Sequence, residues 1–173
     1  MEEVYLAKPT AALQTEYMDF YEEWVASGET MVPWVISQDP TDFAAMLQLL
    51  HDNAAGVNQP DGWVPSSTFW LVTGRNRIVG AVNIRHRLTE WLVHHGGHIG
   101  YGIRPSERRK GYATKQLALA LIETRRLGIN RALVICDAAN TASERTILRN
   151  GGIQDADFIE EDGNVLHRFW IEC

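Results

Sequence analysis

Two stretches near the start of the chain repeat their apolar residues at steps of three and four, the spacing that places side chains on one face of a helix. The first stretch predicts a helix over residues 12–27, ended by Gly28. The second predicts a helix from a cap at Asp39-Pro40 or Thr41 to near residue 56. The apolar residues that define these two faces are Leu13, Tyr17, Phe20, Tyr21 and Trp24, and Phe43, Met46, Leu47 and Leu50.

The rest of the chain alternates short apolar runs with periodic segments. Expected strands cover residues 4–7, 68–73, 77–85, 98–104, 132–137, 153–160 and 165–171, and expected helices cover 112–127 and 141–150. Because the helix over 112–127 connects two strands, we expect those strands to be parallel through a right-handed crossover. The sequence therefore predicts an α/β (α+β) fold, a single domain over residues 1–173, with one mixed, mostly antiparallel sheet.

Composition narrows the classes of function. Lys and Arg number 16 and Asp and Glu number 22, a net charge of −6, so we expect no nucleic-acid partner. No apolar run approaches the roughly 18 residues needed to span a bilayer, and the N-terminus lacks the basic-then-apolar order of a signal peptide. Two cysteines, Cys136 and Cys173, make no disulfide framework, so we expect a cytoplasmic protein without a membrane partner. The sequence leaves a monomer and a homodimer open.

Positive charge is concentrated where the strand over 98–104 meets the helix that begins at Tyr112. Residues 104–110 carry four basic side chains and one acidic one, Glu107, so the remainder of the chain has 12 basic against 21 acidic residues. The first amides of a helix have no intrahelical partner and lie at the positive end of its dipole, and Gly111 lets a ligand approach the backbone. This turn therefore predicts a site for an anionic ligand.

The same turn resembles that of a known family. Arg108-x-x-Gly111-x-Ala113 fits the Q/R-x-x-G-x-G/A pattern of the GNAT superfamily of N-acetyltransferases, in which the amides of the turn hold the pyrophosphate of acetyl-coenzyme A (acetyl-CoA). Asn140-Thr-Ala-Ser143 and Asn150-Gly-Gly152 are also similar to that superfamily, and the resemblance covers roughly residues 68–173.

The resemblance implies an N-acetyltransferase that moves an acetyl group from acetyl-CoA to a small-molecule or peptide amine by direct attack in a ternary complex. The residues that it assigns to the cofactor are Ile103, Arg108, Arg109, Lys110, Gly111, Tyr112, Ala113, Thr114, Asn140 and Ser143. Asparagine is also a good helix N-cap, so Asn140 has a second role open to it. Gly100 and Gly102, inside a strand, suit close approach of the cofactor arm or a packing bulge.

Catalysis of amine acetylation needs a base and an acid. His98 stands where several relatives carry a glutamate, and imidazole has a suitable pKa of ~6.5, so His98 is the first candidate base and Tyr101 the alternative. The usual tyrosine acid of the family falls on Ile147, which cannot donate a proton. The acid is therefore unassigned, with solvent, Tyr101 and Ser143 as substitutes.

Two other classes remain open. A catalytically idle acyl-CoA-binding module would explain the missing tyrosine. A nucleotide-phosphate binder would need a metal-holding carboxylate near the turn, and Glu107 alone is a poor one. The histidines at positions 94, 95 and 98 lack the cysteine or carboxylate support of a closed zinc site, so we expect no metal.

Overall fold

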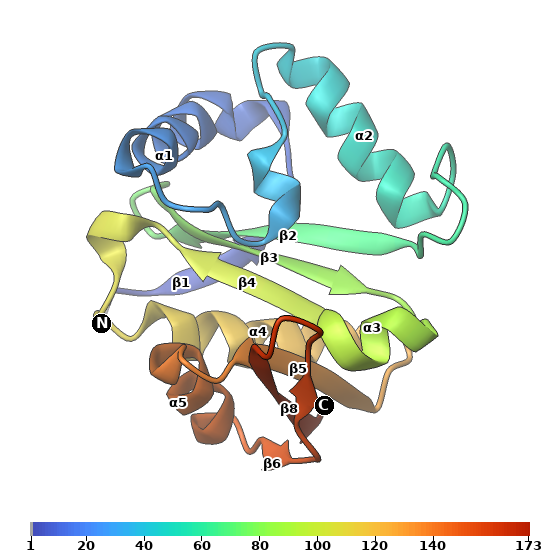
Figure 1. Ribbon diagram of the computed structural model, residues 1–173. Helices are drawn as coiled ribbons and strands as arrows, with labels where there is room; N and C mark the ends of the chain where they lie inside the picture. The colour runs from blue at the N-terminus through green and yellow to red at the C-terminus, as the bar shows by residue number, and fades with distance from the viewer. Residues whose placement is uncertain (1) are drawn as a thin grey trace.

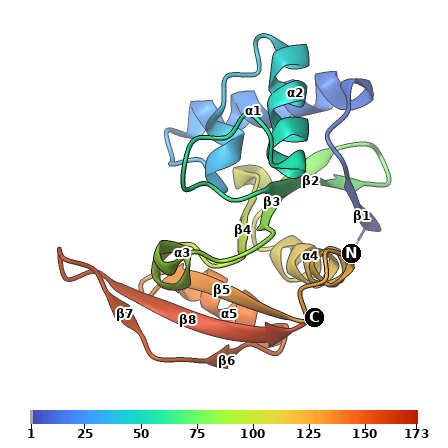
Figure 2. The ribbon, with the colours of Figure 1, turned by 90° about the vertical axis from the view of Figure 1, so that its right-hand side faces the viewer.

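Two antiparallel sheets form the framework of the protein, and the computed structural model describes residues 2–173 (Figures 1 and 2). The first sheet pairs its strands in the order β1 (Val4–Ala7), β2 (Ser66–Thr73), β3 (Ile78–Arg85) and β4 (Ile99–Ile103). The second contains β5 (Arg131–Asp137), β8 (Val165–Glu172) and β6 (Ile153–Gln154), with β7 (Phe158–Ile159) also paired to β8. The predicted α/β class and the mostly antiparallel pairing are confirmed.

The division into two sheets corrects the expectation of one. β4 and β5 meet where the backbone N–H of His98 donates to the carbonyl of Leu133 at 2.7 Å, and they form no ladder beyond that point. Gly97, at φ +62°, permits this approach, because a Cβ there would overlap the Leu133 oxygen.

Helices α1 (Gln14–Ser27) and α2 (Phe43–Ala55) cover one face of the first sheet, as Figure 1 shows. The predicted apolar faces are the ones that pack: Tyr17 of α1 stacks on Trp70 of β2 with ring centroids 4.4 Å apart. The second helix begins slightly later than expected, because Asp42 caps it by accepting the N–H of Ala45. Left-handed glycines end both helices, as predicted.

Helix α4 (Tyr112–Arg126) packs on the opposite face of the first sheet and also touches the second sheet (Figure 2). Leu117 and Ala120 are fully buried in a core shared by both sheets, which is why this helix is apolar on more than one side. Helix α5 (Thr141–Arg149) lies beside α4. The order β4, α4, β5 preserves the predicted strand–helix–strand connection, but among residues 2–173 no parallel ladder joins β4 to β5.

Several short elements were not predicted. Helix α3 (Glu90–His95) has only six residues, and tertiary contacts stabilise its end: Arg85 donates to the carbonyls of Gly96 and Gly97, and Arg168 donates to that of Val93. The 3₁₀ turns are η1 (Ala11–Leu13), η2 (Trp34–Ser37) and η3 (Pro105–Glu107). Over residues 2–173, no helix is both long and apolar enough to cross a membrane.

Candidate functional site

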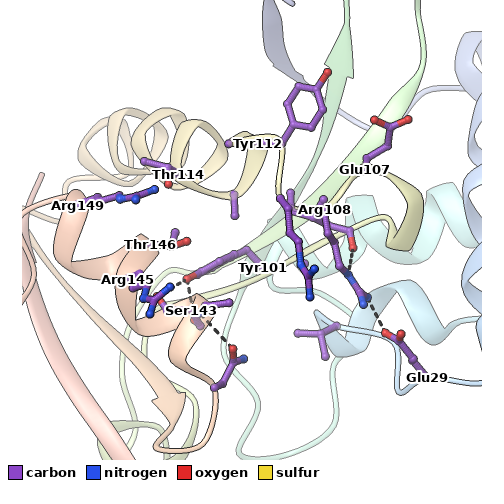
Figure 3. Close-up of a pocket in the computed structure, with 18 of the residues that line it drawn as sticks. Glu29, Tyr101, Glu107, Arg108, Tyr112, Thr114, Ser143, Arg145, Thr146 and Arg149 are labelled. Carbon is purple, nitrogen blue, oxygen red and sulfur yellow. Dashed lines mark hydrogen bonds and ion pairs between the residues drawn. The ribbon is translucent and has the colours of Figure 1, made fainter. Parts of the chain in front are cut away.

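A cavity of about 650 Å³ opens between β4, the turn that precedes α4, helix α5 and the loop after α1 (Figure 3). All the predicted cofactor residues except Lys110 line it, and so does Tyr101. Gly102, for which the sequence left a close approach of the cofactor arm open, also lines the cavity. The lining residues that the sequence did not assign to a ligand are Trp24, Glu29, Thr30, Val32, Glu107, Ala142, Arg145, Thr146 and Arg149.

The turn before α4 is built to present backbone amides. Arg109 at φ +62° and Gly111 at φ +84° bend the chain sharply between η3 and the helix. Gly111 is the N-cap residue and offers no side-chain acceptor, and the first helical bond runs from the N–H of Lys115 to its carbonyl. The amides of residues 112–114 therefore have no intrahelical partner and lie at the positive end of the helix dipole. This is the geometry of an anion site.

The edge of β4 that faces the cavity is open. On either side of β4, the backbone N–H of Arg104 donates to the carbonyl of Val79, and the carbonyl of His98 accepts the N–H of Arg85. The even-numbered residues of β4 between them therefore direct their backbone groups at β3. By the alternation of a strand, the amides and carbonyls of Tyr101 and Ile103 point the other way. The carbonyl of Ile103 already accepts a bond from the Arg108 side chain at 3.1 Å. An extended chain of amides has the right chemistry to add along this edge.

The glycines of β4 leave room for the loop after α1 to pack against the strand. A Cβ at Gly102 would overlap the carbonyl oxygen of Val32, and one at Gly100 would lie 3.5 Å from the Cβ of Pro33. Val32 and Pro33 thus cross this face of the strand. The close approach inferred from sequence is real, but the backbone that makes it belongs to the protein itself.

The basic cluster of the turn divides in two. Arg104 is buried in ion pairs with Asp19 and Glu23 of α1. Lys110, which does not line the cavity, pairs with Glu107 at 2.8 Å. Arg108 and Arg109 line the cavity. Of the four basic side chains, only these two are therefore placed for a ligand.

Arg108 connects the turn to α1 and the loop that follows it. Its guanidinium lies 5.1 Å from the ring centre of Trp24 and 2.6 Å from the carboxylate of Glu29 (Figure 3). The hydrogen bond from Arg108 holds the pKa of Glu29 below its usual value. The loop and the turn are thus coupled through one side chain.

Two hydroxyl groups meet inside the cavity. The Tyr101 hydroxyl lies 2.8 Å from Oγ of Ser143, whose N–H donates to the Oδ1 of Asn140 (Figure 3). Burial raises the pKa of Tyr101 to about 12, so the phenol stays protonated at neutral pH. Burial also raises the pKa of the nearby Cys136 thiol to about 11. Ile147, at the position of the family tyrosine, is fully buried.

His98 is placed differently from the other candidates. Its side chain is 6% exposed and outside the cavity lining, and its Nδ1 accepts the N–H of Leu133 at 2.9 Å. Burial, and then the charge of Arg85, lower its pKa. Because His98 joins β4 to β5 through both its backbone and its ring, its position argues for holding the strands together and against action as a base.

Replacing His98 with alanine should therefore lower the free energy of unfolding and leave turnover nearly unchanged. An unsatisfied Leu133 amide is expected to lower the free energy of unfolding by about 1–3 kcal/mol, measured by denaturant titration. His98→Asn, whose Oδ1 can replace Nδ1 as acceptor, should recover much of that loss. A turnover that falls by ~10²-fold in a folded His98→Asn protein would restore His98 as the base.

The neighbouring histidines pack against aromatic rings. His94 stacks on Phe158 and His95 on Trp91, each with ring centroids 4.7 Å apart. Among residues 2–173, no group of three or more His, Cys, Asp and Glu side chains is placed to hold a metal ion.

Comparison with known proteins places this chain in a class, the acetyltransferases. The sequence model of the acetyltransferase (GNAT) domain matches residues 5–153. The chain belongs to this family, as the turn predicted, and is an acetyl-CoA-dependent N-acetyltransferase. No curated protein matches the sequence.

Solved structures share the fold at low identity. A microcin self-immunity acetyltransferase, MccE, in complex with acetyl-CoA and AMP is 16% identical over 100% of this chain and 94% of its own, with a TM-score of 0.69. A Salmonella typhimurium acetyltransferase that modifies the N-terminal serine of a ribosomal protein is 12% identical over 98% and 95%, with a TM-score of 0.69. The dodecameric spermidine N-acetyltransferase of Vibrio cholerae is 12% identical over 98% and 92%, with a TM-score of 0.63.

Proposed function

We propose that this protein transfers the acetyl group of acetyl-CoA directly to a primary amine of a small molecule or peptide, in a ternary complex. The observation that carries the proposal is the continuity of one cavity, which runs from the free amides at the start of α4 to the open edge of β4. A phosphate group and an amide chain joined in one ligand are the features of a coenzyme A thioester.

The lining residues fit that cosubstrate part by part. The amides of residues 112–114, with Arg108 and Arg109, would hold the pyrophosphate. The backbone groups of Tyr101 and the N–H of Ile103, whose carbonyl is taken by Arg108, would bond the pantetheine amides as a neighbouring strand does. Asn140, which caps α5, and Ser143 lie on the facing wall.

Direct attack is favoured over an acetylated enzyme because the cavity offers no activated nucleophile. Cys136 is the nearest thiol, and a pKa of about 11 keeps it protonated at neutral pH. The hydroxyl of Ser143 is bonded to a phenol that is itself protonated, so no neighbour removes its proton. The amine of the acceptor must therefore attack the thioester carbon itself.

The hydroxyl pair would stabilise the leaving thiolate by hydrogen bonds. A thiol has a pKa of ~8.5, whereas Tyr101 has one of about 12, so complete proton transfer from Tyr101 is uphill by roughly 5 kcal/mol. Hydrogen bonds from Ser143 and Tyr101 to the thiolate need no such transfer, and the thiolate can then take its proton from solvent. These hydrogen bonds would stabilise the leaving thiolate in place of the family's tyrosine acid, and neither side chain would have to give up its proton.

The pH dependence should then follow the acceptor and not the enzyme. His98 is buried and accepts the N–H of Leu133, so it does not deprotonate the substrate amine, which has to lose its proton before it attacks. The value of kcat/KM should therefore rise with pH toward the pKa of the substrate amine, ~8 for an α-amino group and ~10.4 for a lysine-like amine. Rate profiles for two acceptors that differ in pKa test this. A shared limb near ~6.5 for both acceptors would point to a histidine base.

The proposed function is tested by following the acetyl group. Incubation with acetyl-CoA alone should leave the intact mass of the protein unchanged, and addition of a panel of amines and peptides should give an acetylated product. An acetylated protein that forms at a catalytically competent rate would contradict direct transfer. If acetyl-CoA binds but no acceptor is acetylated, the chain is an idle acyl-CoA-binding module.

A further inference from the structure

Three arginines line the cavity without an ion-pair partner among residues 2–173: Arg109 of the turn, and Arg145 and Arg149 of α5. The chain has more acidic than basic residues, and most of its other arginines are bonded to a carboxylate or a backbone carbonyl. Three unpaired guanidinium groups around one cavity indicate more negative charge in the ligand than the turn alone would hold.

The two arginines of α5 lie on a different wall from the turn. They are four residues apart, so they share one face of the helix, about 6 Å apart along its axis. Like charges at this spacing repel each other in the free protein. A position in the last turn, near the negative end of the helix dipole, accounts for Arg149 alone, whereas Arg145 lies one turn earlier.

A side-chain contact fixes the distance between this wall and the phosphate turn. Asn150, next to Arg149, donates to the carbonyls of Thr146 and Thr114, at 2.9 and 3.2 Å. Thr114 lies within the first turn of α4, so the end of α5 is held about one helical turn, ~5 Å, from the free amides. In Figure 3 the guanidinium of Arg149 extends toward Thr114.

The direction of α5 assigns these arginines to one end of the cosubstrate. Near its N-terminus, Ser143 bonds Tyr101 of β4, and the N-cap residue Asn140 also lines the cavity, so both would meet the pantetheine arm. Arg145 and Arg149 lie further along the helix, beside the phosphate turn. On the proposed layout, the adenosine of coenzyme A leaves the pyrophosphate on that side, and its 3′-phosphate is the anion without an assigned partner.

We propose that Arg145 and Arg149 form the site for the 3′-phosphate of coenzyme A, so that the protein distinguishes coenzyme A from 3′-dephospho-coenzyme A. The inference rests on the proposed function for the identity of the ligand. It adds two specificity-determining residues, which bind through charge-assisted hydrogen bonds and take no part in the acetyl transfer.

Calorimetry with both ligands tests the assignment. The wild-type protein should bind coenzyme A about tenfold or more tightly than dephospho-coenzyme A. The double variant Arg145→Gln with Arg149→Gln should bind coenzyme A about tenfold or more weakly than wild type, while its affinity for dephospho-coenzyme A changes by less than about threefold. The matched control is Arg126→Gln, which removes one positive charge from the far end of α4, outside the cavity lining. It should leave both affinities unchanged.

The outcomes separate the two claims. An equal loss for both ligands in the double variant would place the arginines on the pyrophosphate and overturn the inference, with the proposed function intact. Unchanged affinity for coenzyme A would show that the arginines are solvated, with the same consequence. If wild type binds neither ligand, the proposed function fails and the inference fails with it. Thermal unfolding of each variant shows whether a loss of affinity reflects a loss of fold.

Discussion

Replacement of Gly111 with valine is expected to weaken coenzyme A binding at least tenfold, about 1.4 kcal/mol. Gly111 adopts φ +84°, a conformation that a β-branched residue enters only under strain. The substituted chain should relieve that strain by leaving the left-handed region, which would rotate the amides of residues 112–114 away from the phosphates. Calorimetry with purified, folded protein measures the effect.

Gly128 provides a matched control at the opposite end of the same helix. It has φ +86° and nothing within 4 Å of the position of a Cβ, so Gly128→Val imposes a similar backbone strain far from the cavity. Both variants should lose stability, but only Gly111→Val should lose affinity. Equal affinities for the two variants would mean that the turn does not hold the phosphates.

Removal of the hydroxyl pair is expected to lower kcat and leave acetyl-CoA binding nearly intact. Tyr101→Phe keeps the ring and removes the hydroxyl that bonds Ser143, and Ser143→Ala removes the serine hydroxyl. Hydrogen bonds to a charged group are worth about 1.5–3 kcal/mol, so each substitution should reduce kcat by roughly 10- to 10²-fold. Because the two groups act on one thiolate, the double variant should lose less than the product of the single effects.

Ile147→Val is the control for this pair. It trims a fully buried side chain at the position where the family keeps its tyrosine, and should cost about 0.5–1.5 kcal/mol of stability with kcat unchanged. Turnover that is insensitive to both hydroxyls would leave solvent as the sole source of stabilisation for the thiolate.

The sequence predicted the glycine-bearing strand-to-helix turn because the features of that turn are local. The turn combines a glycine in the left-handed region, basic neighbours and a strand-to-helix junction within a few residues. Asn140 likewise predicts the start of the next helix, because asparagine is a preferred N-cap residue. The sequence could also have indicated Arg145 and Arg149 as a pair, because their spacing places both on one face of the helix predicted over 141–150.

The rest depends on contacts between distant segments. Arg104 belongs to the basic cluster of the turn in the sequence, but the fold brings Asp19 and Glu23 beside it. The ion pair between Lys110 and Glu107, three residues apart, is by contrast local. His98 became a strand-joining residue because Gly97 lets β5 approach its ring. The division into two sheets also lies outside what strand order predicts, because β4 and β5 meet at His98 and Leu133 and form no ladder.

The most direct test of acetyl transfer in this cavity is the release of free thiol from acetyl-CoA in the presence of an amine acceptor. A screen of amines and peptides at neutral pH should reveal at least one acceptor that raises the rate above the acceptor-free background. At limiting acetyl-CoA, that acceptor-dependent rate should fall in Gly111→Val and persist in Gly128→Val. Thiol release that no acceptor raises, from protein that binds acetyl-CoA in calorimetry, would contradict the account.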